Sequence, residues 1–93
     1  MPAAQATDMD ATTLTQALAL ADAAGGVREA AAALRSALAP LRVVVVDAFD
    51  MRGEAPAASS TRCHLYLGAN DGHCWTVTQD WARAAGLFIT ERA

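Results

Sequence analysis

Both cysteines and both histidines of this 93-residue chain lie in one stretch, CHLYLGANDGHCW, residues 63–75. Two thiols and two imidazoles match the ligand set of a structural zinc site. Their spacing does not, because Cys63–His64 and His73–Cys74 are adjacent pairs, and neighbouring residues of a strand point to opposite faces of the sheet. We therefore expect no metal, no cofactor and no disulfide in this stretch.

The same stretch predicts a β-hairpin that turns at residues 69–72, where Asn, Asp and Gly suit positive φ. We expect Leu65 to pair with Trp75 and Tyr66 with Cys74. One face of the hairpin is then apolar and carries Leu65, Leu67, Trp75 and Val77. The opposite, polar face forms the candidate ligand-binding groove and carries His64, Tyr66, Cys74 and Thr76.

Catalysis in this groove would need more than the residue types present. A Cys–His nucleophile requires direct hydrogen-bonding contact and an oxyanion hole, and the predicted register leaves His64 and Cys74 as diagonal neighbours about 7 Å apart. We predict no catalytic residues. A thiol or metal binder, or a small-molecule binder, is the alternative use of the same face.

Composition indicates one small folded domain. The chain is 54% hydrophobic and 18% charged, which is enough apolar surface for a packed core. We expect a disordered tail at residues 1–9 and a single domain at residues 10–93. A net charge of −3 argues against nucleic-acid binding. All basic residues are arginines, which excludes any Schiff-base lysine.

Membrane and export signals are not apparent. No apolar run reaches the 20 residues of a membrane-spanning helix, and the first residues, MPAAQATDMD, lack the basic start of a secretory signal. We expect a cytoplasmic protein without a membrane partner, in which both cysteines stay reduced.

The first half of the chain predicts a helical hairpin. Asp10 or Thr12 is a suitable N-cap for a helix that runs to residue 24, and the glycines that follow end it. A second helix is expected over residues 27–39, before Pro40. Apolar residues recur at helical spacing in both segments and should face the core.

The second half predicts β-structure, which makes the fold α+β. Four successive valines predict a strand within residues 41–49, and a loop follows over residues 50–60. After the hairpin, Thr78 should cap a short helix at residues 79–85, and a last strand closes the chain. The order is α-α-β-β-β-α-β, with the helical hairpin packed on a mainly antiparallel four-stranded sheet.

The valine strand also suggests an interface. It is apolar on both faces, and the two N-terminal helices can cover only one of them. A homodimer that buries Val44 and Val46 would cover the other face, although the short helix is an alternative cover. Trp81 is expected either in the core or at such an interface. Asp47, at the end of this strand, is expected to meet an arginine or solvent, with a buried functional acid as the alternative.

The C-terminal third supplies a family resemblance. LYLGANDGHCWTVTQDWARAAGLFITER contains LYL, a polar turn, the pair His73–Cys74, a threonine before a short helix, and AAGL before a closing strand. In this order of pieces it resembles a group of small uncharacterised bacterial proteins, some encoded beside nitrogen-fixation genes. The resemblance implies an accessory protein without an assigned activity, and it does not extend to Cys63–His64. Together with the residues, it predicts a noncatalytic accessory or regulatory module that dimerises.

Overall fold

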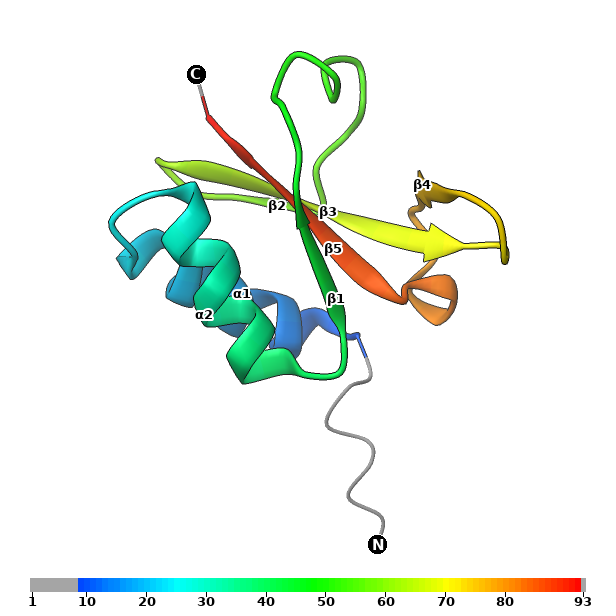
Figure 1. Cartoon of the computed structure of the whole chain (residues 1–93), viewed down its shortest axis with the longest axis horizontal. Helices are drawn as coiled ribbons and strands as arrows, with labels where there is room; N and C mark the ends of the chain where they lie inside the picture. Colours follow the sequence, from blue (N-terminus) through cyan, green and yellow to red (C-terminus); the bar gives the residue numbers. More distant parts are fainter. Residues whose placement is uncertain (1–8, 93) are drawn as a thin grey trace, which may run out of the picture.

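The fold is α+β, as predicted, with a helical hairpin packed against one face of a sheet. The computed structural model describes residues 9–92. Helices α1 (Ala11–Ala23) and α2 (Val27–Leu38) lie on one side of the sheet, and the connection after the first strand rises from the other side (Figure 1). The strands are β1 (Arg42–Val45), β2 (Ala58–Ser59), β3 (Cys63–Asn70), β4 (Trp75–Val77) and β5 (Gly86–Glu91).

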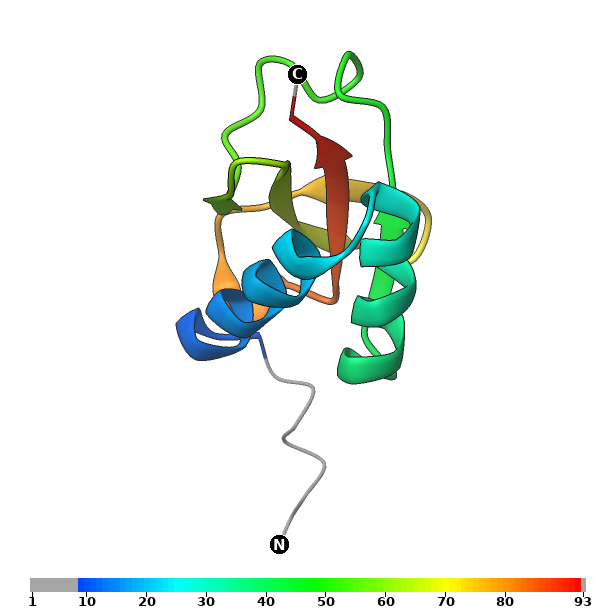
Figure 2. The ribbon, with the colours of Figure 1, turned by 90° about the vertical axis from the view of Figure 1, so that its left-hand side faces the viewer.

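The helical hairpin forms where the sequence places it. The Asp10 carboxylate accepts a hydrogen bond from the Thr13 amide at 2.8 Å, which satisfies one of the free N–H groups of the first turn. Leu14, Ala17 and Ala21 recur on one side of α1 and are buried. The two helices lie side by side against the sheet (Figure 2). Their alanine-rich faces allow this close packing because alanine side chains are small.

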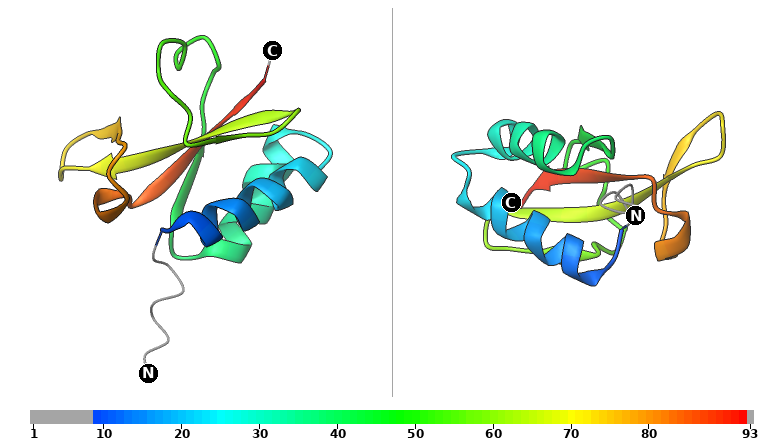
Figure 3. Two further views of the ribbon diagram at one scale, coloured as in Figure 1. Left: turned by 180° about the vertical axis from the view of Figure 1, so that it is seen from behind. Right: turned by 90° about the horizontal axis from the view of Figure 1, so that it is seen from below.

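The sheet is mixed and has five strands rather than the predicted four. Its order is β1-β5-β3-β2, with β4 also paired to β3. Strand β3 is antiparallel to each of its partners, whereas β1 runs parallel to β5, with Val43 opposite Leu87. The end of β3 and its hairpin project beyond the helices (Figure 3). The extra strand β2 arises because part of the predicted loop pairs with β3 at His64 and Leu65.

Two other predictions need correction. The short helix is a single 3₁₀ turn, η2 (Trp81–Arg83), and its cap is Asp80, whose carboxylate accepts from the Ala82 amide at 2.9 Å. Thr78 instead accepts from the Asp80 amide. The predicted tail falls outside the described residues except for Met9, which is buried in the core.

The main core lies between the helices and the sheet. Odd-numbered residues of β1, β3 and β5 face the helices, as strand alternation requires. We call this the helix-side core. Its buried members on the sheet are Val43, Cys63, Leu65, Leu67, Leu87 and Ile89.

The second face of the sheet is covered by the protein's own chain. Residues 47–56, which we call the strap, rise from this face as a loop (Figure 1), and the side chain of Met51 is buried against the sheet. The second-face cluster consists of buried Met51, Tyr66 and Phe88, with half-buried Val44, Val46, Trp75 and Val77 around them. The prediction that the short helix or a second subunit covers this face was therefore incomplete, because the loop and β4 supply the cover. Trp81 lies outside both clusters and is 41% exposed, so a core position for it was wrong.

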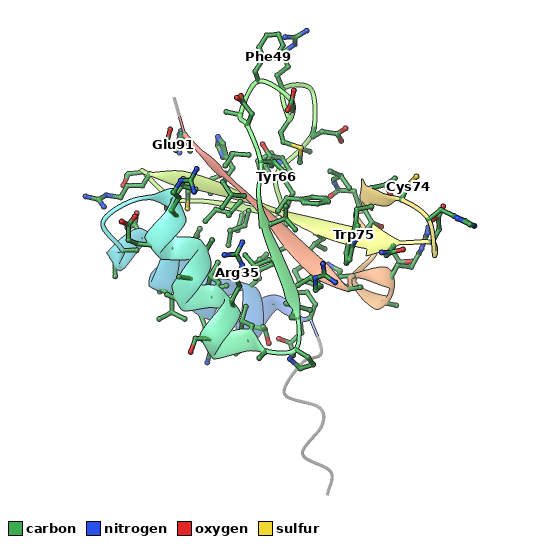
Figure 4. The ribbon with its side chains drawn as sticks, in the orientation of Figure 1. Arg35, Phe49, Tyr66, Cys74, Trp75 and Glu91 are labelled. Atoms are coloured by element: carbon green, nitrogen blue, oxygen red, sulfur yellow. The ribbon has the colours of Figure 1, made fainter. Side chains whose placement is uncertain are left out.

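The free edge of β1 is partly closed. Arg35 of α2 donates from Nε to the Val43 carbonyl at 3.0 Å, across the edge that has no neighbouring strand (Figure 4). Asp47, just beyond β1, is exposed and accepts from the Phe49 amide at 2.7 Å. It caps the first turn of the strap and is not a buried acid.

Candidate functional site

The register of the β3–β4 hairpin differs from the prediction. Trp75 lies opposite Asn70, and Thr76 lies opposite Ala69. Trp75 was expected opposite Leu65, so the pairing is displaced by five residues along β3. An odd displacement moves every side chain of β4 to the other face. Trp75 therefore packs on the second face with Tyr66, not on the helix side.

The turn explains this register. It falls at residues 71–74, and the Asp71 carboxylate accepts from the amides of His73 and Cys74, each at 2.9 Å. These bonds, that from Cys74 first, hold the pKa of Asp71 below its ordinary value. Gly72 has a φ of 100°, which the sequence anticipates, and its amide donates to the Asn70 side chain. The hydrogen bonds of Asp71 place the turn two residues later than expected, which displaces the pairing by four residues. The fifth residue of displacement arises because the expected pairing of Leu65 with Trp75 does not match a four-residue turn at residues 69–72.

Two glycines make room for the indole on the second face. Gly68 and Gly86 are directly opposite each other in β3 and β5. A Cβ on Gly68 would lie 3.3 Å from the Trp75 ring, and a Cβ on Gly86 would lie 3.2 Å from it. Trp75 also meets Phe88 edge to face, with ring centroids 6.3 Å apart. Glycine in two neighbouring strands is a sequence signal for such close approach.

Of the four predicted groove residues, the structure brings two together. His64 and Tyr66 share the second face, with ring centroids 6.3 Å apart in an edge-to-face arrangement. Cys74 is exposed in the turn, well away from Tyr66 (Figure 4). Thr76 pairs with Ala69 and so belongs to the opposite face, where it is exposed. The grouping of Cys74 and Thr76 with His64 was wrong because it depended on the register.

The cysteines and histidines do not converge. Cys63 is buried on the helix side, with its thiol 3.5 Å from the Ser60 hydroxyl, and Cys74 lies past the far end of β3. Eight residues of strand separate these two ends by about 23 Å at the usual rise. Within residues 9–92, no three His, Cys, Asp or Glu side chains are placed to hold a metal ion. Both thiols are free.

A row of polar side chains crosses the second face instead. Ser59 of β2 lies opposite His64, and its hydroxyl is 2.6 Å from the imidazole Nδ1. On the other side of His64 lies Thr90 of β5, its direct cross-strand partner. Sequence reasoning missed Ser59 and Thr90. Ser59 lies in a segment that the sequence predicts as a loop. Thr90 is a common residue type in strands, so the sequence does not mark it as functional.

Three groups in this row and beside it have unused hydrogen-bonding capacity. Thr90 is fully buried, and its hydroxyl has no hydrogen-bond partner in the described part of the chain. The Nε2 atom of His64 and the hydroxyl of Tyr66 likewise make no hydrogen bond to residues 9–92. A donor or acceptor that is buried without a partner costs roughly 1–3 kcal/mol, so Thr90 is the exceptional group of this face.

A groove of about 360 Å³ opens between the strap and this part of the sheet. Met51, Arg52 and Pro56 line its strap side, and His64 and Tyr66 line its sheet side. The strap is held mainly by itself. The backbone hydrogen bonds of residues 47–54 are turns within the strap, such as Met51 to Ala48 at 3.1 Å. Its contacts with the rest of the chain include the buried Met51 side chain and a hydrogen bond from the Gln79 side chain to the Ala55 carbonyl at 3.4 Å.

Comparisons with protein-family models, with curated proteins and with solved structures each gave no match. Across residues 9–92 we find no helix of the length and apolar character needed to cross a bilayer. The geometry of the second face therefore carries the functional argument.

Proposed function

We propose that this protein is a noncatalytic accessory module that holds a small polar ligand in the groove under the strap. The observation that carries the proposal is the groove itself, which is lined by His64 and Tyr66, two side chains with unused hydrogen-bonding capacity. His64 Nε2 and the Tyr66 hydroxyl supply the hydrogen-bonding positions for a ligand. Thr90 lies beside His64 but is fully buried and does not line the groove, so it is not part of the proposed site.

The contact between Ser59 and His64 does not favour an enzyme. A serine nucleophile needs a base that a third group orients, together with donors for an oxyanion. The second nitrogen of His64 has no such partner among the described residues. We therefore assign the pair to orienting the imidazole. A fluorophosphonate probe should leave Ser59 unlabelled, and covalent labelling at Ser59 would contradict the noncatalytic assignment.

Binding is tested by two-dimensional NMR on the ¹⁵N-labelled protein with a library of small polar fragments. Bound fragments should shift the amides of His64, Tyr66 and the strap. His64→Phe, which keeps a ring and removes both nitrogens of a groove-lining residue, should abolish these shifts, whereas Thr76→Val, on the opposite face of the sheet, should leave them unchanged. A library that shifts no groove amide, or that shifts them equally in His64→Phe, would refute the proposed site.

Self-association as a homodimer is the second part of the proposal. Its support is the large apolar side chains left exposed, above all Phe49, which is 66% exposed, and Trp81. Val44 and Val46 are half-buried beneath the strap, so they are a weaker basis for an interface than the sequence suggests. Sedimentation at micromolar concentrations should give a dimer that Trp81→Ala weakens. A monomer throughout that range would contradict this part.

An accessory role in the cytoplasm completes the proposal. It is supported by the resemblance of the C-terminal third and by two free thiols, which a reducing compartment preserves. Co-purification from the native host tests whether the module works with a partner protein, and the variant that no longer binds fragments is the control. If a variant that no longer dimerises recovers the same proteins as the wild type, partner binding does not depend on self-association.

A further inference from the structure

The outer edge of β1 is closed at Val43 and open at Val45. The Val46 amide donates to the Ile89 carbonyl at 3.0 Å, so the even-numbered residues of β1 bond to β5. The odd-numbered residues therefore direct their N–H and C=O groups away from β5. At Val43 the carbonyl accepts from Arg35. The N–H and C=O of Val45 have no hydrogen-bond partner within residues 9–92, and the side chain of Val45 is 37% exposed.

The open part of this edge is complementary to a second copy of itself. When two copies of β1 lie antiparallel with Val45 opposite Val45, the N–H of each donates to the C=O of the other. Both open groups of both copies are then satisfied, and Val44 of one copy lies opposite Val46 of the other. The bond between Arg35 and the Val43 carbonyl stays intact. A register centred on Val44 would instead need that carbonyl, which Arg35 already occupies.

The charges along the edge are complementary in the same register. Asp47 of one copy lies opposite Val43 of the other, where the Arg35 guanidinium is held. Arg35 makes no other side-chain hydrogen bond and no ion pair within the described chain, so its remaining N–H donors are available. One carboxylate oxygen of Asp47 accepts a backbone amide, and the other accepts no bond from residues 9–92. Arg28 and Glu91 line the hollow beside Asp47, and their opposite charges leave the balance unchanged.

Exposed aromatic residues lie at the two ends of β1. Phe49 follows the last residue of the strand and is 66% exposed (Figure 4). Trp81 lines a hollow with Pro40 and Leu41, which precede the first residue of the strand. Antiparallel pairing brings the Phe49 end of one copy to the Trp81 end of the other. The two large exposed aromatic side chains are thus gathered at the ends of the paired strands.

We propose that two copies of this chain join edge to edge through β1, with Val45 paired to Val45 on a two-fold axis. An ion pair between Arg35 of one copy and Asp47 of the other lies on each side of the axis. This inference rests on the self-association in the proposed function and adds its interface. It joins the two five-stranded sheets into one continuous sheet.

Cross-linking tests the register. A residue lies opposite itself only on a two-fold axis, and the Cα atoms of such a hydrogen-bonded pair are about 5.5 Å apart, within reach of a disulfide. Val45→Cys, made in the full chain together with Cys74→Ser, should therefore give a disulfide-linked dimer under mild oxidation. Leu20→Cys with the same second change is the control, since Leu20 is similarly exposed on α1, and it should stay unlinked.

Charge reversal tests the ion pair. Asp47→Arg and Arg35→Glu should each raise the dissociation constant of the dimer about tenfold, because like charges then face each other. The combined variant exchanges the two charges and should recover most of the lost affinity. Asp22→Arg, which makes the same charge change on α1, is the control and should leave the dissociation constant unchanged. Sedimentation equilibrium at constant ionic strength measures all four variants.

The outcomes separate this interface from self-association itself. A dimer that neither reversal weakens, or whose Val45→Cys variant links no more readily than the Leu20→Cys control, would overturn the interface and leave self-association standing. A combined variant no tighter than either single reversal would overturn the ion pair and with it the register. A monomer at every concentration would overturn both self-association and the interface, and the fragment screen would still decide ligand binding.

Discussion

Replacing Thr90 by valine should make the protein more stable. The hydroxyl of Thr90 is fully buried and has no hydrogen-bond partner within residues 9–92, so folding removes it from water without replacing the lost bond. Valine has nearly the same shape and suits a strand equally well. Removing an unsatisfied polar group of this kind should stabilise the fold by about 1 kcal/mol, at the lower end of the usual desolvation cost.

Urea unfolding followed by circular dichroism measures the effect. With a slope of about 1 kcal/mol per molar urea, a gain of this size raises the midpoint by about 1 M. In a thermal scan it corresponds to roughly 4–8 °C for a domain of this size. Thr90→Ser is the matched control. It keeps the hydroxyl and deletes a buried methyl group, so it should lose about 1 kcal/mol.

The opposite result would refute the reasoning. If Thr90→Val lowers the free energy of unfolding by 1 kcal/mol or more (about the value of a hydrogen bond), the hydroxyl has a partner in the folded protein.

Three further results are expected. Gly86→Ala should lose roughly 2 kcal/mol of unfolding free energy in urea, because its Cβ would lie 2.7 Å from the Arg42 carbonyl oxygen; Gly25→Ala, with open space around it, should be neutral, and equal losses would refute the steric account. Met51→Ala should speed amide hydrogen exchange in the strap but not in β5, and unchanged strap exchange would show another anchor. Asp10 has its pKa lowered in the folded state by the hydrogen bond from the Thr13 amide, so its contribution to stability is present above the unfolded pKa and is lost as the pH falls through the folded value. The Asp10→Asn variant should therefore lose less stability than the wild type between about pH 5 and pH 2, and parallel losses would contradict this.

The helical half was predictable because its signals are local. A capping carboxylate at Asp10, apolar residues at helical spacing and the Gly25–Gly26 pair act within a few residues of one another. The helices begin and end within about one residue of the predicted bounds, and α1 begins directly after Asp10, one of the two predicted caps. No long-range contact was needed to find them.

The candidate site was only partly predictable because it depends on register. His64 and Tyr66 alternate along one strand, so any register keeps them on one face, and the structure brings them together. Cys74 and Thr76 could be joined to them only through the position of the turn, which the Asp71 hydrogen bonds set. A register error of an odd number of residues exchanges the faces, which is why half of the predicted groove was wrong.

By itself, the sequence determined the fold class, the helical hairpin, the alternation that divides the cysteine and histidine pairs, and the glycine of the turn. Only the tertiary structure decided that Ser59 pairs beside His64, that Thr90 is buried without a partner, and that the strap covers the second face. The physical reason is that propensity, capping and alternation act between near neighbours in the chain. The polar row and the groove join β2, β3, β5 and the strap, and these segments meet only when the sheet is assembled.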